Sequence, residues 1–282
     1  MPSLSTEDGR KLAWREVGSG APLLMHPGGP GCSSVHFGEL PELAAERTLI
    51  LLDPRGTGDS DRPVDPSDYD LEAYAADVEA VREALGLERL DLLGHSHGGF
   101  VAMMWGGTYP DRVGRLILAN TAPRFTDSIR GLRMERVGSH QGQPYFGDAV
   151  AALQEQQAGN YSSDEELVAL YERAGPVFAP LGEDIAPVAS AFRKSGVNAD
   201  AMKHFNGRIA GGMDLRPQLA RIDAPTLVLA CERDAFNAVT SEIAQSLPNP
   251  TVATVLESDH FAYLFPDRRA SWSRAVFDFL AR

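Results

Sequence analysis

The stretch Leu90-Asp91-Leu92-Leu93-Gly94-His95-Ser96-His97-Gly98-Gly99-Phe100 decides the fold of this chain. An apolar run ends in the pattern Gly-x-Ser-x-Gly, and a helix-like run over residues 100–109 follows. This order predicts a strand, one sharp turn and a helix, with Ser96 at the tip of the turn. Such a turn strains the backbone of the serine, and glycine is needed two residues to either side because a side chain would collide there. We therefore predict that Ser96 is a nucleophile exposed at the carboxyl end of a strand.

Composition limits the partners and the compartment. The chain of 282 residues has 26 Lys and Arg against 39 Asp and Glu, which gives a net charge of −13. This charge disfavours nucleic acids and anionic membrane surfaces as partners, and no apolar run is long enough to span a bilayer. Residues 1–8 lack the basic and apolar regions of a signal peptide, so we expect a cytoplasmic protein. Cys32 and Cys231 form neither a disulfide framework nor a metal set.

Strand patterns and helix patterns alternate over most of the chain. Helices are predicted over 40–45, 71–85, 100–109, 237–247 and 267–280. Strands are predicted over 3–6, 11–16, 22–25, 48–52, 115–119, 226–230 and 251–256, in addition to the strand before Ser96. Alternation of this kind predicts an α/β fold with a mostly parallel central sheet and helices on both faces.

The alternation stops over residues 124–213, which have helical periodicity and no convincing strand pattern. Ser163-Asp164-Glu165-Glu166 is a capping box that predicts the start of a helix. An insertion that leaves the carboxyl end of a strand lies over the edge of the sheet where Ser96 is expected. We therefore predict a core formed by residues 1–123 and 214–282, with 124–213 as a helical lid whose aromatic side chains partly face the pocket.

A nucleophilic serine needs a base, and the base needs an acid that orients it. Where a serine occupies this kind of turn, the acid and then the histidine follow it along the chain. Asp234 lies just past the strand over 226–230, whereas Asp223 precedes that strand and the side chain of Glu232 should point elsewhere. Asp234 is therefore the predicted acid, although it could equally cap the next helix. His260 is the predicted base, because it is the only histidine after the acid.

The tetrahedral intermediate of acyl transfer needs two aligned hydrogen-bond donors. The predicted oxyanion hole consists of the backbone N–H of His97, next after the serine, and that of Gly29 in the loop His26-Pro27-Gly28-Gly29-Pro30-Gly31. The side chains of His95 and His97 are expected to pack around the turn, pointing away from the serine hydroxyl. His140 and His204 fall in the predicted lid and could touch a substrate.

Three segments together resemble the α/β-hydrolase superfamily, and within it the proline iminopeptidase-like branch. They are the turn around Ser96, the loop Gly28-Gly29-Pro30-Gly31 and the segment Asp53-Pro54-Arg55-Gly56-Thr57-Gly58-Asp59-Ser60. The resemblance implies an α/β-hydrolase fold with an inserted lid and a hydrolytic serine enzyme. Pro27 and His97 differ from the histidine and tryptophan typical of the branch. The lid glutamates that hold the substrate amine in proline iminopeptidases have no recognisable match in this chain.

The sequence supports a serine hydrolase that cleaves an ester, lactone or amide of a small apolar molecule through an acyl-enzyme on Ser96. One alternative is a proline iminopeptidase-type aminopeptidase. Another is a non-hydrolytic protein on the same scaffold, namely an acyltransferase, a synthase or a ligand-binding protein. No metal or other cofactor is implied, since the glycine-rich loops fit neither the dinucleotide-binding nor the P-loop spacing. The acyl group, the leaving group and the oligomeric state are left open.

Overall fold

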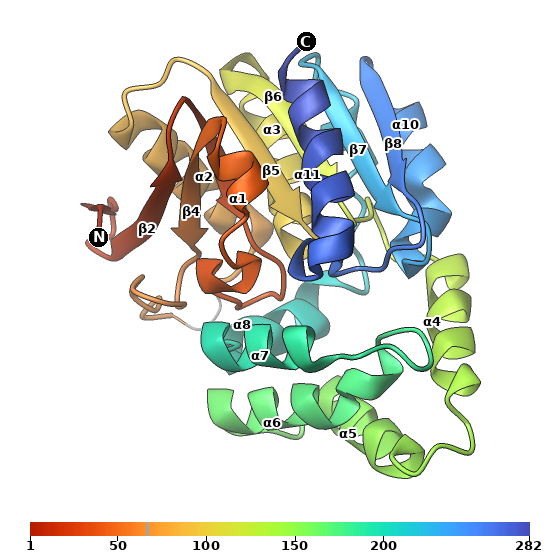
Figure 1. Cartoon of the computed structure of the whole chain (residues 1–282). Helices are drawn as coiled ribbons and strands as arrows, with labels where there is room; N and C mark the ends of the chain where they lie inside the picture. Colours follow the sequence, from red (N-terminus) through yellow and green to blue (C-terminus); the bar gives the residue numbers. More distant parts are fainter. Residues whose placement is uncertain (66–67) are drawn as a thin grey trace.

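One eight-stranded sheet runs through the molecule, which we describe from a computed structural model covering residues 1–65 and 68–282 (Figure 1). The strand order is β1-β2-β4-β3-β5-β6-β7-β8; β2 is antiparallel to β1 and β4, and the other neighbours are parallel. The predicted α/β fold class is therefore confirmed. The strands are β1 (Ser3–Ser5), β2 (Lys11–Gly18), β3 (Ala21–His26), β4 (Arg47–Asp53), β5 (Leu90–His95), β6 (Val113–Ala119), β7 (Thr226–Cys231) and β8 (Pro250–Val255).

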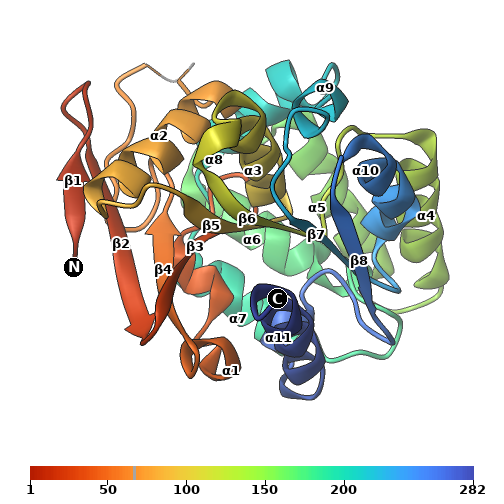
Figure 2. The same ribbon diagram turned by 90° about the horizontal axis from the view of Figure 1, so that it is seen from above.

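Both faces of the sheet are buried, because successive side chains of a strand point to opposite faces. In β3, Leu24 joins the apolar cluster on one face, whereas Leu23 and Met25 join the cluster on the other. Figure 2 shows α1 (Pro41–Ala44) and α11 (Pro266–Leu280) on one side of the sheet. The other side is covered by α2 (Leu71–Ala84), α3 (His97–Thr108), α9 (Arg216–Leu219) and α10 (Thr240–Ser246).

Six α-helices lie between β6 and β7 in the chain, and all of them but α9 lie beyond the carboxyl ends of the parallel strands (Figure 1). The last four of these five share a small apolar cluster, which includes Leu167, Leu170 and Phe192, whereas the first contributes Ile129 to the core of the sheet. The predicted capping box begins the third of them, since Ser163 Oγ accepts a hydrogen bond from Glu166 N at 3.2 Å. We call them the inserted helices: α4 (Asp127–Ser139), α5 (Phe146–Ala158), α6 (Asp164–Ala174), α7 (Ala186–Ser195) and α8 (Ala199–His204).

Two helices differ from their predicted limits for local reasons. α3 begins at His97, three residues before the predicted start, because the chain enters the helix directly from the turn at Ser96. The helix predicted over 237–247 begins instead as a 3-10 helix, Ala235–Val239, and continues as α10. There Asp234 caps the first turn by accepting a hydrogen bond from Phe236 N at 3.1 Å.

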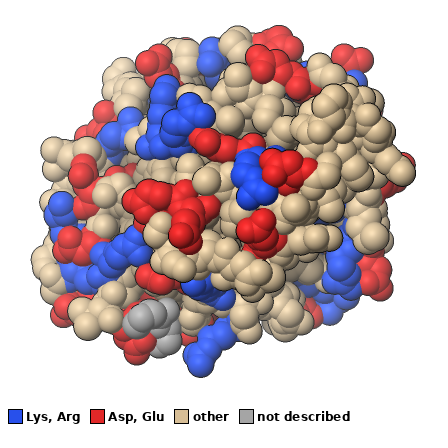
Figure 3. All heavy atoms as spheres, turned by 90° about the horizontal axis from the view of Figure 1, so that it is seen from below, with Lys and Arg blue, Asp and Glu red and all other residues tan. Residues whose placement is uncertain are grey.

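Charges of both signs are interspersed on the face that is seen from below in Figure 3. Charged side chains of the inserted helices form surface pairs, such as Arg173 with Asp148 and Arg193 with Glu172, each at 2.7 Å. The acidic surplus of the chain is thus not gathered into one patch on this face. Among residues 1–65 and 68–282, no helix combines the length and the apolar character that crossing a bilayer requires.

Candidate active site

Parallel pairing brings the candidate residues to one edge of the sheet. His26 of β3 is in register with Gly94 of β5, and His95 of β5 with Ala119 of β6. β6, β7 and β8 continue the same parallel order. The loops that follow β3, β5, β6, β7 and β8 therefore all emerge at the carboxyl edge. β3 and β5 mark the point where the strand order reverses, which is where open α/β sheets bind their ligands.

The turn after β5 holds Ser96 in a strained conformation, with φ 55° and ψ −116°. Its amide donates a hydrogen bond to Ala119 O at 2.9 Å, and its carbonyl accepts one from Thr121 Oγ1 at 2.8 Å. A Cβ at Gly94 would lie 2.2 Å from Gly98 O, and one at Gly98 would lie 2.2 Å from the carbonyl oxygen of His26. The backbone can make this turn only because both positions lack a side chain.

His260 and Asp234 form a hydrogen-bonded pair beside this turn. His260 Nδ1 donates to Asp234 Oδ2 at 2.7 Å, and the imidazole of His260 lies 4.8 Å from that of His95, the residue before Ser96. Two further contacts hold His260 in place. Its amide donates to Asp259 Oδ1 at 2.6 Å, and its carbonyl accepts from His95 Nε2 at 2.9 Å. With the proton on Nδ1, the other ring nitrogen is free to accept a proton.

Asp234 is buried and yet ionised. Burial raises its pKa, but the positive charge of His260 and hydrogen bonds from His260, Asn120 and Phe236 outweigh burial and lower the pKa to about 2. The competing carboxylate of Glu232 is exposed and accepts a hydrogen bond from Glu257 N at 2.8 Å. Asp234 also caps the following 3-10 helix, so the two roles considered from the sequence coexist in one carboxylate.

The loop after β3 lies directly against the serine turn. A Cβ at Gly28 would lie 3.0 Å from Ser96 Cβ, and Gly29 has φ 116°, a conformation that favours glycine. Across the described residues, 1–65 and 68–282, the amide of Gly29 donates no hydrogen bond to protein. The amide of His97 is the first of α3, where helical N–H groups lack an intrahelical partner. Both amides are therefore available to a ligand near Ser96.

Comparison with known proteins agrees with this architecture. The sequence profile described as "alpha/beta hydrolase fold" matches residues 21–267. The chain belongs to the α/β-hydrolase fold family. A proline iminopeptidase of Heyndrickxia coagulans is 29% identical over 262 residues, which cover 88% of this chain and 87% of that protein. This hydrolase-fold chain is accordingly an enzyme related to proline iminopeptidases, as the resemblance of its motifs implied.

Solved structures give the same result for the fold. A hydrolase from Pseudomonas aeruginosa PA01 superimposes on the whole chain and on 98% of its own length, with a TM-score of 0.74 and 27% identity. The enol-lactonase from Burkholderia xenovorans LB400 superimposes over the full length of both chains, with a TM-score of 0.69. At 22% identity the second likeness concerns the fold alone.

The side chains of the other histidines of this hydrolase are buried or bonded to protein. Desolvation lowers the pKa of His26 to about 4 and that of His36 to about 3, and it also lowers the pKa of His95 and His97. Directly after α4, both ring nitrogens of His140 are bonded, to Tyr145 Oη and to Ala179 O. His204 Nε2 contacts Asp70 Oδ1 at 2.7 Å. The two histidines that were considered as substrate contacts, His140 and His204, thus already have protein partners.

Sequence reasoning missed the residues that support the pair. Asn120, which directly follows β6, donates from Nδ2 to Asp234 Oδ2 at 2.8 Å and has φ 51°. Arg136 of α4 forms an ion pair with Asp259, next to His260. A polar residue directly after a predicted strand is a signal that could have indicated Asn120. No comparable signal exists for Arg136, since its partner is 123 residues away in the chain.

Hydrogen bonds and an ion pair hold the second glycine-rich segment, residues 53–60, and Asn198 contacts both this segment and the glycine-rich loop after β3. Asp53 Oδ1 accepts a hydrogen bond from Ser34 N at 2.8 Å, and Arg55 pairs with Asp77 of α2 at 2.8 Å. Asn198, just before α8, donates to Gly56 O at 2.8 Å, and its own amide donates to Gly31 O at 2.9 Å. Both glycine-rich loops are therefore tied to the inserted helices.

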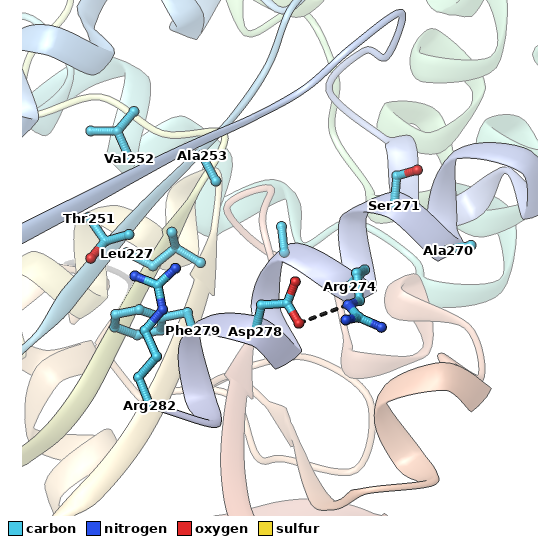
Figure 4. Close-up of a pocket in the computed structure, with 11 residues that line it drawn as sticks. Leu227, Thr251, Val252, Ala253, Ala270, Ser271, Arg274, Asp278, Phe279 and Arg282 are labelled. Carbon is cyan, nitrogen blue, oxygen red and sulfur yellow. Dashed lines mark ion pairs between the residues drawn. The ribbon is translucent and has the colours of Figure 1, made fainter.

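A cavity of about 590 Å³ lies away from these residues, between α11 and the first residues of β7 and β8 (Figure 4). Its lining includes Leu227, Thr251 and the ion pair of Arg274 with Asp278 at 2.7 Å. It opens near the amino ends of the strands, opposite to the edge that carries Ser96.

Among residues 1–65 and 68–282, no group of three or more His, Cys, Asp or Glu side chains is arranged to hold a metal ion.

Proposed function

We propose that the chain is a serine hydrolase that cleaves an ester, lactone or amide bond of a small, mainly apolar substrate. The observation that carries the proposal is the 2.7 Å contact between His260 Nδ1 and the buried carboxylate of Asp234, beside the strained Ser96. Such a pair fixes the tautomer in which the second imidazole nitrogen can remove a proton from a serine hydroxyl.

In the proposed reaction Ser96 Oγ attacks the carbonyl carbon, and its proton passes to His260 Nε2. The amides of Gly29 and His97 stabilise the resulting oxyanion, and the loss of one such donor typically costs about 3 kcal/mol in the transition state. His260 then gives the proton to the leaving group, which departs and leaves an ester on Ser96. A water molecule then attacks the carbonyl carbon of this ester and gives a proton to His260; the bond to Ser96 Oγ breaks, the proton returns from His260 to Ser96 Oγ, and the acid is released. The inserted helices act as a lid over this edge of the sheet.

Ser96→Ala tests the proposal with p-nitrophenyl acetate as substrate. We expect turnover to be abolished and labelling by a fluorophosphonate probe to be lost. Ser271→Ala is the matched control, because Ser271 is an exposed serine at the distant cavity between α11 and β8. A Ser96→Ala enzyme that turns over the ester at the wild-type rate would refute the triad.

The relative from H. coagulans favours a proline iminopeptidase activity as the second candidate. That activity needs recognition of the free amine of proline, so acetylation of the amine in proline p-nitroanilide must abolish cleavage. Three acidic residues of the inserted helices are already engaged: Glu166 with Ser162 N, Glu172 with Arg193 and Glu155 with Arg173. An acyltransferase or synthase would instead pass the acyl group to an acceptor other than water, and a ligand-binding protein would not react with the probe.

A further inference from the structure

Arg133 of α4 is close to the His260–Asp234 pair and has no oppositely charged partner. Its guanidinium carbon lies 5.0 Å from the centre of the Phe236 ring, and that ring lies 5.5 Å from the imidazole of His260. The ring of Phe236 is therefore close both to the guanidinium of Arg133 and to the imidazole of His260, the candidate base. Within residues 1–65 and 68–282, Arg133 forms neither a hydrogen bond nor an ion pair with the protein.

The position of Arg133 is set by its neighbours on the same helix. Arg136, one turn further on, is paired with Asp259 and also donates to Arg233 O, which anchors α4 beside the loop that carries His260. Arg130, one turn before, is paired with Asp127 on the surface. Because residues three apart lie on the same side of a helix, the anchored Arg136 directs Arg133 toward the same edge of the sheet.

The surroundings of Arg133 are aromatic, with the ring of Phe125 at 5.9 Å in addition to that of Phe236. Desolvation lowers the pKa of Arg133, while the charge of Asp234 and the phenol of Tyr171 act in the opposite direction. The side chain is nevertheless accessible to solvent. A guanidinium remains charged near neutrality, so here an exposed cation lies against two aromatic rings and has no acidic partner in the described part of the chain.

We propose that Arg133 binds a carboxylate of the substrate, so that this enzyme prefers esters or amides whose acyl group carries a second, free carboxylate. This inference rests on the proposed function, since the carboxylate is recognised beside the same reacting centre. The planar guanidinium can donate two parallel hydrogen bonds to a carboxylate. The single charge of Arg133 can pair with one carboxylate of the substrate, and the rings of Phe125 and Phe236 can contact its apolar part.

The same cation disfavours the substrate of a proline iminopeptidase. A positively charged amine near Arg133 would be repelled, and the carboxylate of Asp234 already accepts hydrogen bonds from His260, Asn120 and Phe236. Arg133 therefore supplies a reason, in addition to the engagement of Glu155, Glu166 and Glu172 with other protein groups, why a relative of proline iminopeptidases would act on a different substrate class.

The test compares two esters of equal shape, the mono-p-nitrophenyl ester of succinic acid and p-nitrophenyl levulinate, in which a methyl group replaces the charged oxygen. The measured quantity is the ratio of their kcat/KM values. Arg133→Gln should lower this ratio roughly 10- to 100-fold, because it removes a charge-assisted hydrogen bond to the carboxylate of the succinate ester. The change should appear mainly as a higher KM for that ester. Arg133→Lys should restore part of the ratio. Arg130→Gln, the matched control one turn away, should leave the ratio unchanged.

Failure of this inference is distinguishable from failure of the proposed function. If Ser96→Ala stops turnover of both esters but Arg133→Gln leaves their ratio unchanged, only the role of Arg133 is wrong. If Ser96→Ala still hydrolyses the levulinate ester, the serine mechanism is wrong. Binding is read separately by titrating succinanilic acid into Ser96→Ala and into the Ser96→Ala, Arg133→Gln double variant. Roughly tenfold weaker binding to the double variant supports the carboxylate site even if neither ester is hydrolysed, and equal binding overturns it.

Discussion

Replacing Asp234 by asparagine changes one atom and tests the reasoning about the candidate pair most directly. The carboxylate accepts three hydrogen bonds, from His260 Nδ1 at 2.7 Å, Asn120 Nδ2 at 2.8 Å and Phe236 N at 3.1 Å. An amide at this position offers one acceptor oxygen and one NH₂ group. With its oxygen toward His260 and Asn120, the NH₂ group would face the amide of Phe236. With its NH₂ group toward His260, a donor would face the Nδ1 proton, unless His260 moves that proton to Nε2. In that tautomer Nε2 can no longer accept the proton of Ser96.

The expected loss follows from this geometry. We expect Asp234→Asn to lower kcat for p-nitrophenyl acetate by roughly 10³- to 10⁴-fold, as loss of the correct tautomer does in triads of this kind. Stability should fall as well, because a carboxyl group whose pKa drops from 3.8 to about 2 on folding contributes roughly 2 kcal/mol. Since folding lowers this pKa, the contribution is complete above pH 3.8 and is lost as the pH falls toward 2. Acid unfolding of the variant should therefore depend less steeply on pH in this window.

The assay is the kcat of purified enzyme at neutral pH, with circular dichroism and the thermal midpoint measured on the same samples. Glu232→Gln is the matched control, because Glu232 is an exposed carboxylate of the same loop. It should keep its activity within about twofold, since surface substitutions usually change little. An Asp234→Asn variant that is folded and retains more than a tenth of the wild-type kcat would refute the assignment of Asp234 as the orienting acid.

Three further variants test the packing around the site. Gly28→Ala places a methyl group 3.0 Å from Ser96 Cβ, and should lower kcat/KM roughly 100-fold by displacing the serine; an unchanged rate would show that the loop can move away. Arg136→Gln leaves the buried carboxylate of Asp259 without its ion pair and should cost about 1–3 kcal/mol of stability in urea unfolding, whereas full stability would mean that α4 is held by other contacts. Leu93→Ala removes most of a fully buried side chain of β5 and should lower the free energy of unfolding by about 2–5 kcal/mol in the same assay. A smaller loss would indicate that neighbouring side chains fill the space that the leucine leaves.

The sequence indicated the order of the elements because the pattern of each is local. Apolar runs such as Leu90–Leu93 end at glycine-rich turns, and every predicted strand has a counterpart in the sheet within a few residues. The start of α3 was less predictable, because Gly98 and Gly99 are poor helix formers and are retained there for tertiary reasons. The carbonyl oxygen of His26 would lie 2.2 Å from a Cβ at Gly98, and Thr121 would lie 2.5 Å from one at Gly99.

The sequence by itself determined the strand–turn–helix around Ser96 and the chain order of the candidate acid and base, because short-range backbone sterics and the logic of the motif suffice for both. Only the tertiary structure showed that Asn120 supports Asp234, that Arg136 pairs with Asp259 next to His260, and that Arg133, close to the His260–Asp234 pair, is unpaired among the described residues. These contacts join strands and helices far apart in the chain. Their geometry depends on the parallel register of the sheet and on how α4 packs against it, and neither is encoded in any one segment.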